Sequence, residues 1–415
     1  NTLSNQEATI DTSMRRLISS FSPCEVIDRS ATVKFTFNGK TYTAHPGDTI
    51  ASALTAAGVK ILSRSFKYHR PRGLLCCAGH CPNCLVQVGD EPNVRACTRP
   101  VEAGMDVRAQ NVWPSLEHDL LSLTQLGSRL MPVGFYYKTF IRPQSLWPLY
   151  ERVLRRAAGL GKVKPQTSEV SKTSEVFDKQ YLHADVAVIG GGPAGISAAL
   201  GAAEEGARVL LFDENPAVGG HLRFTFPLRS PLPDLLESLN QQPNVTVFTD
   251  TAVLGWYKDT WLSAVRGSRL FKIRARSVVV ATGVYETQLI FDNNDLPGVM
   301  LGSAVQRLLH LYGVAPGRQV LIVTANDDGW DMAADLHTMG VNVAAIVDER
   351  DYDACSSPYR NGLIAARIPT FYGHTILEAL GSREVSGARV ARIAPPQSGG
   401  ERGVGDPTTA QTLRC

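Results

Sequence analysis

Residues 76–97 read CCAGHCPNCLVQVGDEPNVRAC, and this stretch decides how the first part of the chain folds. Four of its five cysteines follow the spacing C-x4-C-x2-C-x12-C, which is the plant-type spacing of 2Fe-2S cluster ligands with a shortened final gap. Such a cluster needs four thiolates around two irons, so a tight loop provides three of them and a neighbouring strand the fourth. The predicted cluster ligands are Cys76, Cys81, Cys84 and Cys97.

Three features of this loop leave alternatives open. Tetrahedral zinc sites also use C-x2-C pairs, although zinc ribbons and fingers usually carry two separated pairs. Cys77 is adjacent to Cys76 and is an alternative ligand, but the four-residue spacing favours Cys76. His80 stands where a Rieske-type ligand is conceivable; with four cysteines already in register, we interpret it as an ordinary loop residue.

The residues on either side of the loop predict the fold that holds it. Residues 33–37 alternate apolar and polar side chains, and Asn38-Gly39 follows them, which favours a hairpin with a type I′ turn. Asp48 then suits the N-cap of a short helix that Gly58 ends, and residues 85–97 predict returning strands. A hairpin, a crossing helix and returning strands make a β-grasp layout.

A second motif lies further along, where the short apolar strand Val186–Ile189 leads into the turn GGGPAG of residues 190–195. This is a G-x-G-x-x-G pattern before an Ala- and Leu-rich helix, as in dinucleotide-binding folds. The pyrophosphate of a ligand would lie on the helix N-terminus, where free N–H groups and the helix dipole favour an anion. The predicted contacts are Gly190, Gly192, Pro193, Ala194 and Gly195.

Three further stretches extend this predicted dinucleotide site. Asp213 ends the next strand, where a carboxylate accepts hydrogen bonds from ribose hydroxyls and repels a 2′-phosphate, so the ligand should be FAD or NAD rather than NADP. Glu214 and Gly220 fit the extension that flavoproteins carry after that strand. Thr282 and Gly283 follow a later apolar strand, where an FAD domain meets its inserted domain. The alternative is a nucleotide fold that binds no ligand.

A degraded copy of the strand, turn and helix follows later in the chain. Thr324 and Asn326 occupy its first two glycine positions, and a side chain at the second obstructs the approach of a pyrophosphate. Gly329 takes the third position, and Asp348 lies near the end of the next strand. Two interpretations remain open: a unit kept for packing, and a second dinucleotide site that uses the side chains of Asn326 and Asp327.

These motifs predict an α/β protein in which a β-grasp 2Fe-2S ferredoxin-like domain precedes a two-dinucleotide-binding, Rossmann-like flavoprotein domain. Between them we expect helices near residues 116–126 and 147–158, an aromatic stretch around 135–137 and a flexible polar linker at 164–179. The expected parts are an N-terminal extension (1–29), the ferredoxin-like domain (30–112), a connector (113–182), and the FAD- or NAD-binding domain (183–415) with an inserted second unit at about 300–385.

Composition limits the function. The 415 residues exceed the usual size of one core, and the formal net charge of +3 is too small to indicate nucleic acid or an anionic membrane as a partner. We expect no membrane span, and no secretory signal in the polar N-terminus, which lacks an initiator Met; Met14 is an alternative start. Five of the eight cysteines lie between residues 76 and 97, unlike a secreted disulfide scaffold, so we expect a cytoplasmic protein.

Four stretches also carry a resemblance to a known family: RSFKYHRPRG at 64–73, ATGVYE at 281–286, NNDLPGVM at 293–300 and TANDD at 324–328. From about residue 30 onwards the chain resembles the α subunit of heterotetrameric sarcosine oxidase, whose relatives include the hydrogen cyanide synthase and dye-linked proline dehydrogenase complexes. The resemblance implies an oxidoreductase acting on CH–NH donors in a hetero-oligomer. A small amine or imino acid would be oxidised on a flavin-containing β subunit, with a further flavin at the α/β interface.

Two departures qualify what the resemblance implies. Sarcosine oxidase α subunits commonly lack the cluster cysteines, which this chain keeps as the cyanide synthase-type complexes do; this favours a dehydrogenase over direct use of oxygen. The long α subunits also carry a folate-binding domain, whereas this chain ends at Cys415, where the sheet of the flavoprotein domain should resume. We therefore expect a truncated chain and assign it no folate chemistry.

The sequence thus predicts an electron-transfer subunit that passes electrons between flavin and a 2Fe-2S cluster. A self-contained NADH-dependent reductase, which needs an intact second nucleotide motif, and a non-catalytic scaffold with a structural dinucleotide remain as alternatives. The catalytic residues are unknown, because the histidines are scattered and nothing resembles a catalytic base or nucleophile positioned for substrate. We interpret the basic loop Lys67–Arg72 as a partner-docking or phosphate-contacting surface rather than an RNA site.

Overall fold

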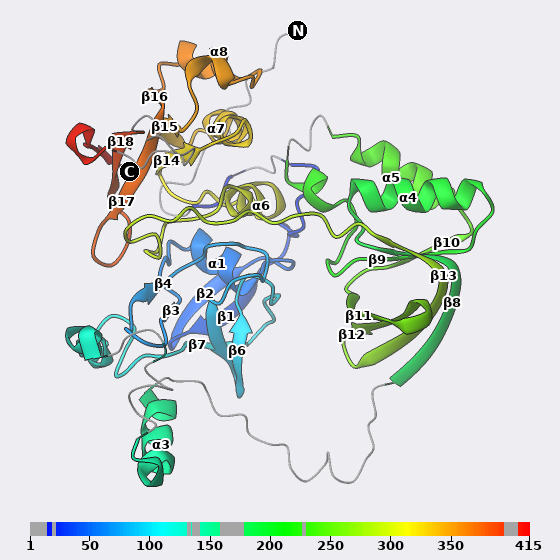
Figure 1. Cartoon of the computed structure of the whole chain (residues 1–415), viewed down its shortest axis with the longest axis horizontal. Helices are drawn as coiled ribbons and strands as arrows, with labels where there is room; N and C mark the ends of the chain where they lie inside the picture. The colour runs from blue at the N-terminus through cyan, green and yellow to red at the C-terminus, as the bar shows by residue number, and fades with distance from the viewer. Residues whose placement is uncertain are drawn as a thin grey trace. The chain divides into compact units, whose positions relative to one another are not determined.

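The structure, a computed structural model, describes residues 15–18, 22–130, 134, 142–157, 178–225, 230–393 and 406–415 (Figure 1). The chain divides into two compact units, which are taken one at a time below. The first comprises Asn1–Phe21, Glu25–Val163 and Glu286–Cys415, and the second comprises Ser22–Cys24 and Lys164–Tyr285.

The first unit contains the predicted β-grasp sheet, whose five strands lie in the order β2-β1-β7-β5-β6. Asn38 and Gly39 have φ values of 51° and 79°, as a type I′ turn requires, so the predicted hairpin is confirmed. The sheet is mixed, because β1 pairs antiparallel with β2 and parallel with β7. The strands are β1 (Val33–Phe37), β2 (Lys40–Ala44), β5 (Leu85–Val88), β6 (Glu91–Arg95) and β7 (Asp106–Ala109).

The crossing helix of this sheet is α1 (Ile50–Ala56), and all of its residues are buried. Our prediction that Asp48 caps it was wrong, because the N-cap is Thr49, whose side chain forms a capping box with Ser52. The Asp48 carboxylate is instead buried in an ion pair with Arg16, 2.8 Å away. Gly58, with φ of 82°, follows the helix end as predicted.

A helix from much later in the sequence completes the core of this β-grasp domain. Ala304 and Leu308 of α6 (Gly302–Tyr312) belong to the same buried cluster as Leu54, Val86 and Cys84. Figure 1 shows α6 between α1 and α7 (Asp328–Thr338) of the degraded nucleotide-binding unit. A short ribbon of β3 (Ser63–Arg64) and β4 (Pro71–Arg72) precedes the cysteine loop.

The degraded nucleotide-binding unit has a parallel three-stranded sheet in the order β14-β15-β16. Trp330, Leu336 and Ile346 are fully buried in its core. Its strands are β14 (Gln319–Thr324), β15 (Asn342–Asp348) and β16 (Thr370–Tyr372), and α8 (Arg360–Ala365) follows β15. An antiparallel sheet of β17 (His374–Leu380), β18 (Gly387–Arg392) and β19 (Gln411–Arg414) comes after it.

The second unit is built on a six-stranded sheet in the order β10-β9-β8-β13-β12-β11. Its central strand β8 begins at Asp178, earlier than the short strand we predicted, because it pairs with β13 along its whole length. In Figure 1, α4 (Pro193–Glu204) and α5 (Leu232–Asn240) lie on the same side of this sheet. The strands are β8 (Asp178–Ile189), β9 (Val209–Phe212), β10 (Val245–Phe248), β11 (Ala252–Tyr257), β12 (Trp261–Arg266) and β13 (Arg269–Val280).

The connector differs in part from our expectation. The first expected helix is a 3-10 helix, η1 (Leu120–Leu130), that begins four residues later than predicted, whereas the second is confirmed as α3 (Trp147–Ala157). The aromatic stretch at 135–137 and most of the linker at 164–179 lie outside the described residues. No described helix is long and apolar enough to cross a membrane. The other 3-10 helices are η2 (Gln144–Leu146), η3 (Gly220–Arg223), η5 (Lys258–Thr260), η6 (Tyr352–Ala354) and η7 (Pro407–Thr409).

Candidate functional site

The structure brings the four predicted cluster ligands together in the first unit. Cys76, Cys84 and Cys97 are buried, and Cys81 is half-buried. Hydrogen bonds join the sulfur atoms in two pairs, Cys76 with Cys81 and Cys84 with Cys97, and a third joins Cys76 to Cys97. Among the described residues, no three His, Cys, Asp or Glu side chains surround one metal ion. The four thiols thus form one hydrogen-bonded chain in the order Cys81, Cys76, Cys97 and Cys84, and a 2Fe-2S cluster needs four thiolates gathered in this way.

Hydrogen bonds among the thiols lower the pKa values of two of these cysteines and raise those of the other two. The pKa of Cys76 lies far below its usual value because the thiols of Cys81 and Cys97 and backbone N–H groups donate to its sulfur. The pKa of Cys84 is also lowered, first by a hydrogen bond from Cys97, whereas the pKa values of Cys81 and Cys97 are raised as they donate. Iron binds the thiolate form, so cluster binding would release the protons that these thiols share.

Cys77 and His80 are the two alternative ligands that the sequence of the loop left open. Cys77 is buried in the apolar core of the β-grasp domain, and burial raises the pKa of its thiol to about 12. Cys76 is hydrogen-bonded to Cys81 and Cys97, whereas Cys77 forms no such bond to the other loop cysteines, so the geometry favours Cys76 over Cys77. His80 is exposed on the loop.

The glycine turn of the second unit is tightly packed except at one position. A Cβ at Gly190, whose φ is 104°, would lie 2.3 Å from the carbonyl oxygen of Ala281, and one at Gly195 would lie 1.8 Å from that of Gly190. At Gly192, the N-cap of α4, the nearest atom is 3.9 Å away, at Gly220. Open space therefore remains at the helix N-terminus, where Pro193 and Ala194 begin α4, and a pyrophosphate fits there.

Hydrogen bonds hold the Asp213 side chain and the glycine turn together. Its carboxylate accepts hydrogen bonds from the backbone N–H of Gly191 at 2.7 Å and from the backbone and side chain of Asn215 at 2.8 and 2.9 Å. A carboxylate has about four acceptor positions, so about one is left for a ribose hydroxyl. Sequence reasoning missed Asn215, although an Asn two residues after an Asp is a common local hydrogen-bonding pattern. Glu214 is exposed beside Asp213.

The remaining predicted residues also lie beside the turn or follow a residue that does. Gly220 has φ of 54°, and a Cβ there would come within 2.9 Å of the Cα of Gly192. The backbone N–H of Ala281 donates to the carbonyl of Ile189 at 2.8 Å, so Thr282 and Gly283, both exposed, begin directly beside the end of β8. The residues predicted for a dinucleotide thus converge on one turn.

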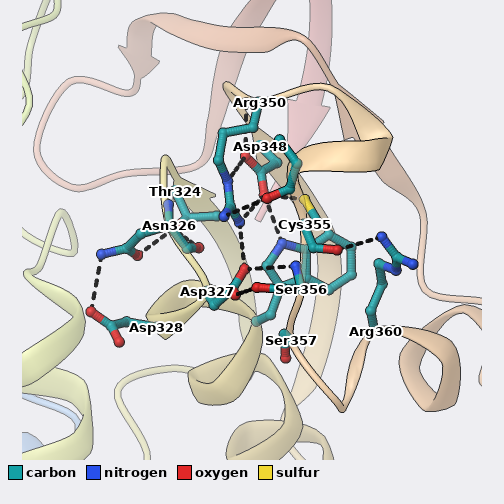
Figure 2. Close-up of polar contacts among 12 residues, drawn as sticks. Thr324, Asn326, Asp327, Asp328, Asp348, Arg350, Cys355, Ser356, Ser357 and Arg360 are labelled. Carbon is teal, nitrogen blue, oxygen red and sulfur yellow. Dashed lines mark hydrogen bonds and ion pairs between the residues drawn. The ribbon is translucent and has the colours of Figure 1, made fainter.

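In the degraded unit, polar side chains around the altered glycine motif contact one another (Figure 2). Arg350 lies 2.9 Å from both Asp327 and Asp348. Thr324 and Asn326 bond to each other, and the Asn326 amide also donates to Asp328 at 3.0 Å. Asp328 and Asp331 stand in the first turn of α7, where carboxylates take the place of a phosphate and repel one.

Asp348 stands at the end of β15, where a ribose-binding acid is expected. It is 1% exposed and accepts the indole N–H of Trp330 at 2.7 Å and the thiol of Cys355 at 3.1 Å. At the third glycine position, a Cβ on Gly329 would lie 2.4 Å from Thr324, which shows close packing of helix on strand. Of our two interpretations, the geometry favours a unit kept for packing, because Asn326 and Asp327 are already engaged.

Two stretches of the chain match known protein families. Residues 30–112 match a 2Fe-2S iron-sulfur cluster binding domain, and residues 185–226 match FAD dependent oxidoreductases. The chain is 40% identical over 395 residues to sarcosine oxidase subunit alpha of Rhizobium meliloti (strain 1021), a match that covers 89% of this chain and 39% of that protein. It is 30% identical over 417 residues to sarcosine oxidase subunit alpha of Corynebacterium sp. (strain P-1), covering 93% and 37%.

A solved structure shows the same fold. L-proline dehydrogenase from P. horikoshii aligns with a TM-score of 0.58 and 21% identity, covering 89% of this chain and 59% of that chain. The chain spans less than two fifths of the length of these two sarcosine oxidase α subunits, 39% of one and 37% of the other. Its cofactors are a 2Fe-2S cluster and FAD, and along most of its length the chain is similar to sarcosine oxidase α subunits.

Proposed function

We propose that this chain is the electron-transfer subunit of a complex that oxidises a small amine or imino acid, and that it passes electrons between flavin and a 2Fe-2S cluster. The observation that carries the proposal is the gathering of four hydrogen-bonded cysteine sulfurs in a chain that also has an open glycine turn for FAD. The substrate class comes from the relatives named sarcosine oxidase and L-proline dehydrogenase.

The chain's own residues would bind the two cofactors and keep water away from the cluster. When bound, a 2Fe-2S cluster supplies one-electron transfer, and FAD supplies hydride and electron chemistry. Cys76, Cys81, Cys84 and Cys97 would hold the cluster, and the apolar core behind them excludes water. The N-terminus of α4 at Gly192 would bind the pyrophosphate of FAD, while Asp213 keeps the glycine turn in place.

Amine oxidation belongs, in this proposal, to a partner. Relatives are named as subunits, which supports a hetero-oligomer with a flavin-containing β-like subunit that oxidises the substrate. We place the complex in the cytoplasm, since half-buried free thiols such as that of Cys81 persist best in a reducing compartment. The alternative of a self-contained NADH-dependent reductase is opposed by the ion pairs of Arg350 in the degraded unit.

Anaerobic mixing of the purified complex with sarcosine or L-proline tests this proposal. We expect the EPR signal of a reduced cluster to appear only with amine and flavoprotein partner both present, and to be absent in Cys81→Ser. The lone chain oxidising NADH as fast as the complex oxidises amine would favour the reductase. A complex that keeps iron and FAD but never reduces the cluster with amine would favour the scaffold.

A further inference from the structure

A helix from a distant part of the sequence packs beside the cysteine loop. The helix α6 packs into the β-grasp core through Ala304 and Leu308, which share a buried cluster with Cys84 and Cys97. The backbone N–H of Leu301, the N-cap of α6, donates to the carbonyl of Leu75 at 3.1 Å, one residue before the first cluster ligand. The helix is therefore fixed against the loop at its start and along one face.

That face carries a cation. Arg307 follows Ala304 by three residues, so both point to the same side of α6, and the Nε of Arg307 is buried. Burial lowers its pKa, and Cys77, Tyr312, Cys76 and Cys97 raise it, in that order of effect. An arginine stays protonated even so. A fixed positive charge thus lies within electrostatic reach of two predicted ligands.

The position of this charge matters because the bound cluster is anionic. Two ferric ions, two sulfides and four thiolates carry a net charge of about −2, and a one-electron reduction adds another negative charge. A nearby cation stabilises the more negative, reduced state more than the oxidised one. In a buried site water screens this attraction weakly, so the cation raises the reduction potential.

We propose that Arg307 sets the reduction potential of the 2Fe-2S cluster from α6, and so determines how readily the cluster accepts an electron from flavin. The inference rests on the proposed electron-transfer function and deepens it. The cysteine spacing gives no sign of this residue, because Arg307 lies far along the sequence, beyond the glycine turn of the second unit.

The test is the midpoint potential of the cluster in the full-length chain, followed by EPR during titration with dithionite. We expect Arg307→Gln to retain iron and to lower the ratio of reduced to oxidised cluster at a fixed potential about tenfold, or about 59 mV for one electron. Arg307→Lys should recover most of the shift, and Arg108→Gln, at an exposed arginine of β7, should change nothing. Either of two results would overturn the proposal. One is an Arg307→Gln chain that keeps its iron and has the wild-type midpoint potential. The other is a midpoint shift in Arg307→Lys as large as that in Arg307→Gln.

A second pair of variants decides the question if Arg307→Gln does not keep its cluster. Ser303 lies one turn before Arg307 on α6, so in Ser303→Glu a carboxylate pairs with the guanidinium and offsets its charge. Ser303→Glu should lower the midpoint relative to Ser303→Gln, and equal midpoints in these two would refute the role of Arg307. A wild-type chain without iron would instead contradict the electron-transfer function itself.

Discussion

At the scale of single residues, the five cysteines of the loop divide into ligands and a core residue. Cys81→Ser should lose the cluster, because one thiolate of a pair is removed, whereas Cys77→Ser should keep about two irons per chain. Serine at position 77 puts a hydroxyl into an apolar core, so it costs about 1–3 kcal/mol of stability without removing a ligand. Iron content and visible absorption of the two purified variants check this. Loss of iron in Cys77→Ser but not in Cys81→Ser would reverse the assignment.

The glycine turn offers a matched pair of substitutions in one helix region. Gly192→Ala should fold, since no atom lies closer than 3.9 Å to the added methyl group, but should weaken FAD binding at least tenfold by blocking the pyrophosphate. Gly201→Ala, within α4 and with nothing within 4 Å, should keep FAD and gain about 0.5–1 kcal/mol. Released flavin and thermal unfolding measure both effects. Equal FAD content in the two variants would mean that FAD does not lie on this turn.

Residue identities predicted some roles and not others. The spacing of the cysteines and glycines predicted which side chains lie together, because those motifs are local and their geometry repeats between proteins. Asp48 and Thr49 are both good N-cap residues, so local sequence cannot choose between them. The choice depends on Arg16, which takes the Asp48 carboxylate and comes from a separate segment. Sequence reasoning missed Arg307 for the same reason, because the residue and the cysteine loop come from separate segments of the chain.

At the scale of elements, the start of α1 depends on that ion pair. Arg16→Met leaves the fully buried Asp48 carboxylate without its guanidinium, and should cost about 3–5 kcal/mol of unfolding free energy. Arg108→Met removes an exposed arginine paired with Asp106 and should change stability by less than about 1 kcal/mol. Urea unfolding of both variants makes the comparison. A loss in Arg16→Met no larger than in Arg108→Met would show that the pair does not stabilise the domain.

The end of β15 gives a prediction for pH. Burial raises the pKa of Asp348, but hydrogen bonds from Arg350, Trp330 and Cys355 more than offset this, so its pKa is lowered overall. A lowered pKa adds stability above the unfolded pKa of about 3.9, and this stability is lost as pH falls through the folded value. Asp348→Asn should therefore be less stable than wild type at pH 7, with the gap narrowing below about pH 4.

Urea midpoints across pH 3–7 check this, with the exposed Asp353→Asn as a control that should follow wild type throughout. A gap between Asp348→Asn and wild type that stays constant or widens at low pH would show that the carboxylate is not stabilised by its donors.

Element boundaries were predicted where local signals are strong and missed where pairing decides them. The hairpin at Asn38-Gly39 and the helix α3 follow from turn and helix patterns. The early start of β8 at Asp178 follows from β13, a partner strand whose register no local pattern reveals. A polar stretch that reads as linker can therefore continue a strand when its neighbour supplies the hydrogen bonds.

At the scale of the whole molecule, the order of motifs predicts the fold class and the family resemblance. It does not predict which elements pack together in space. Sequence order places the FAD motif between the cysteine loop and α6, yet α6 completes the β-grasp core in the first unit. Sequence reasoning treats neighbours in the chain as neighbours in space, so it assigned α6 only to the flavoprotein domain. The electron-transfer account depends on that core enclosing a real cluster.

The most direct measurement is low-temperature EPR and visible absorption of anaerobically purified chain, before and after dithionite, with iron, zinc and flavin quantified. Our account predicts about two irons per chain, released FAD, and a rhombic signal that appears on reduction. A colourless protein that holds zinc or no metal at the four cysteines would contradict it and leave a dinucleotide-binding scaffold.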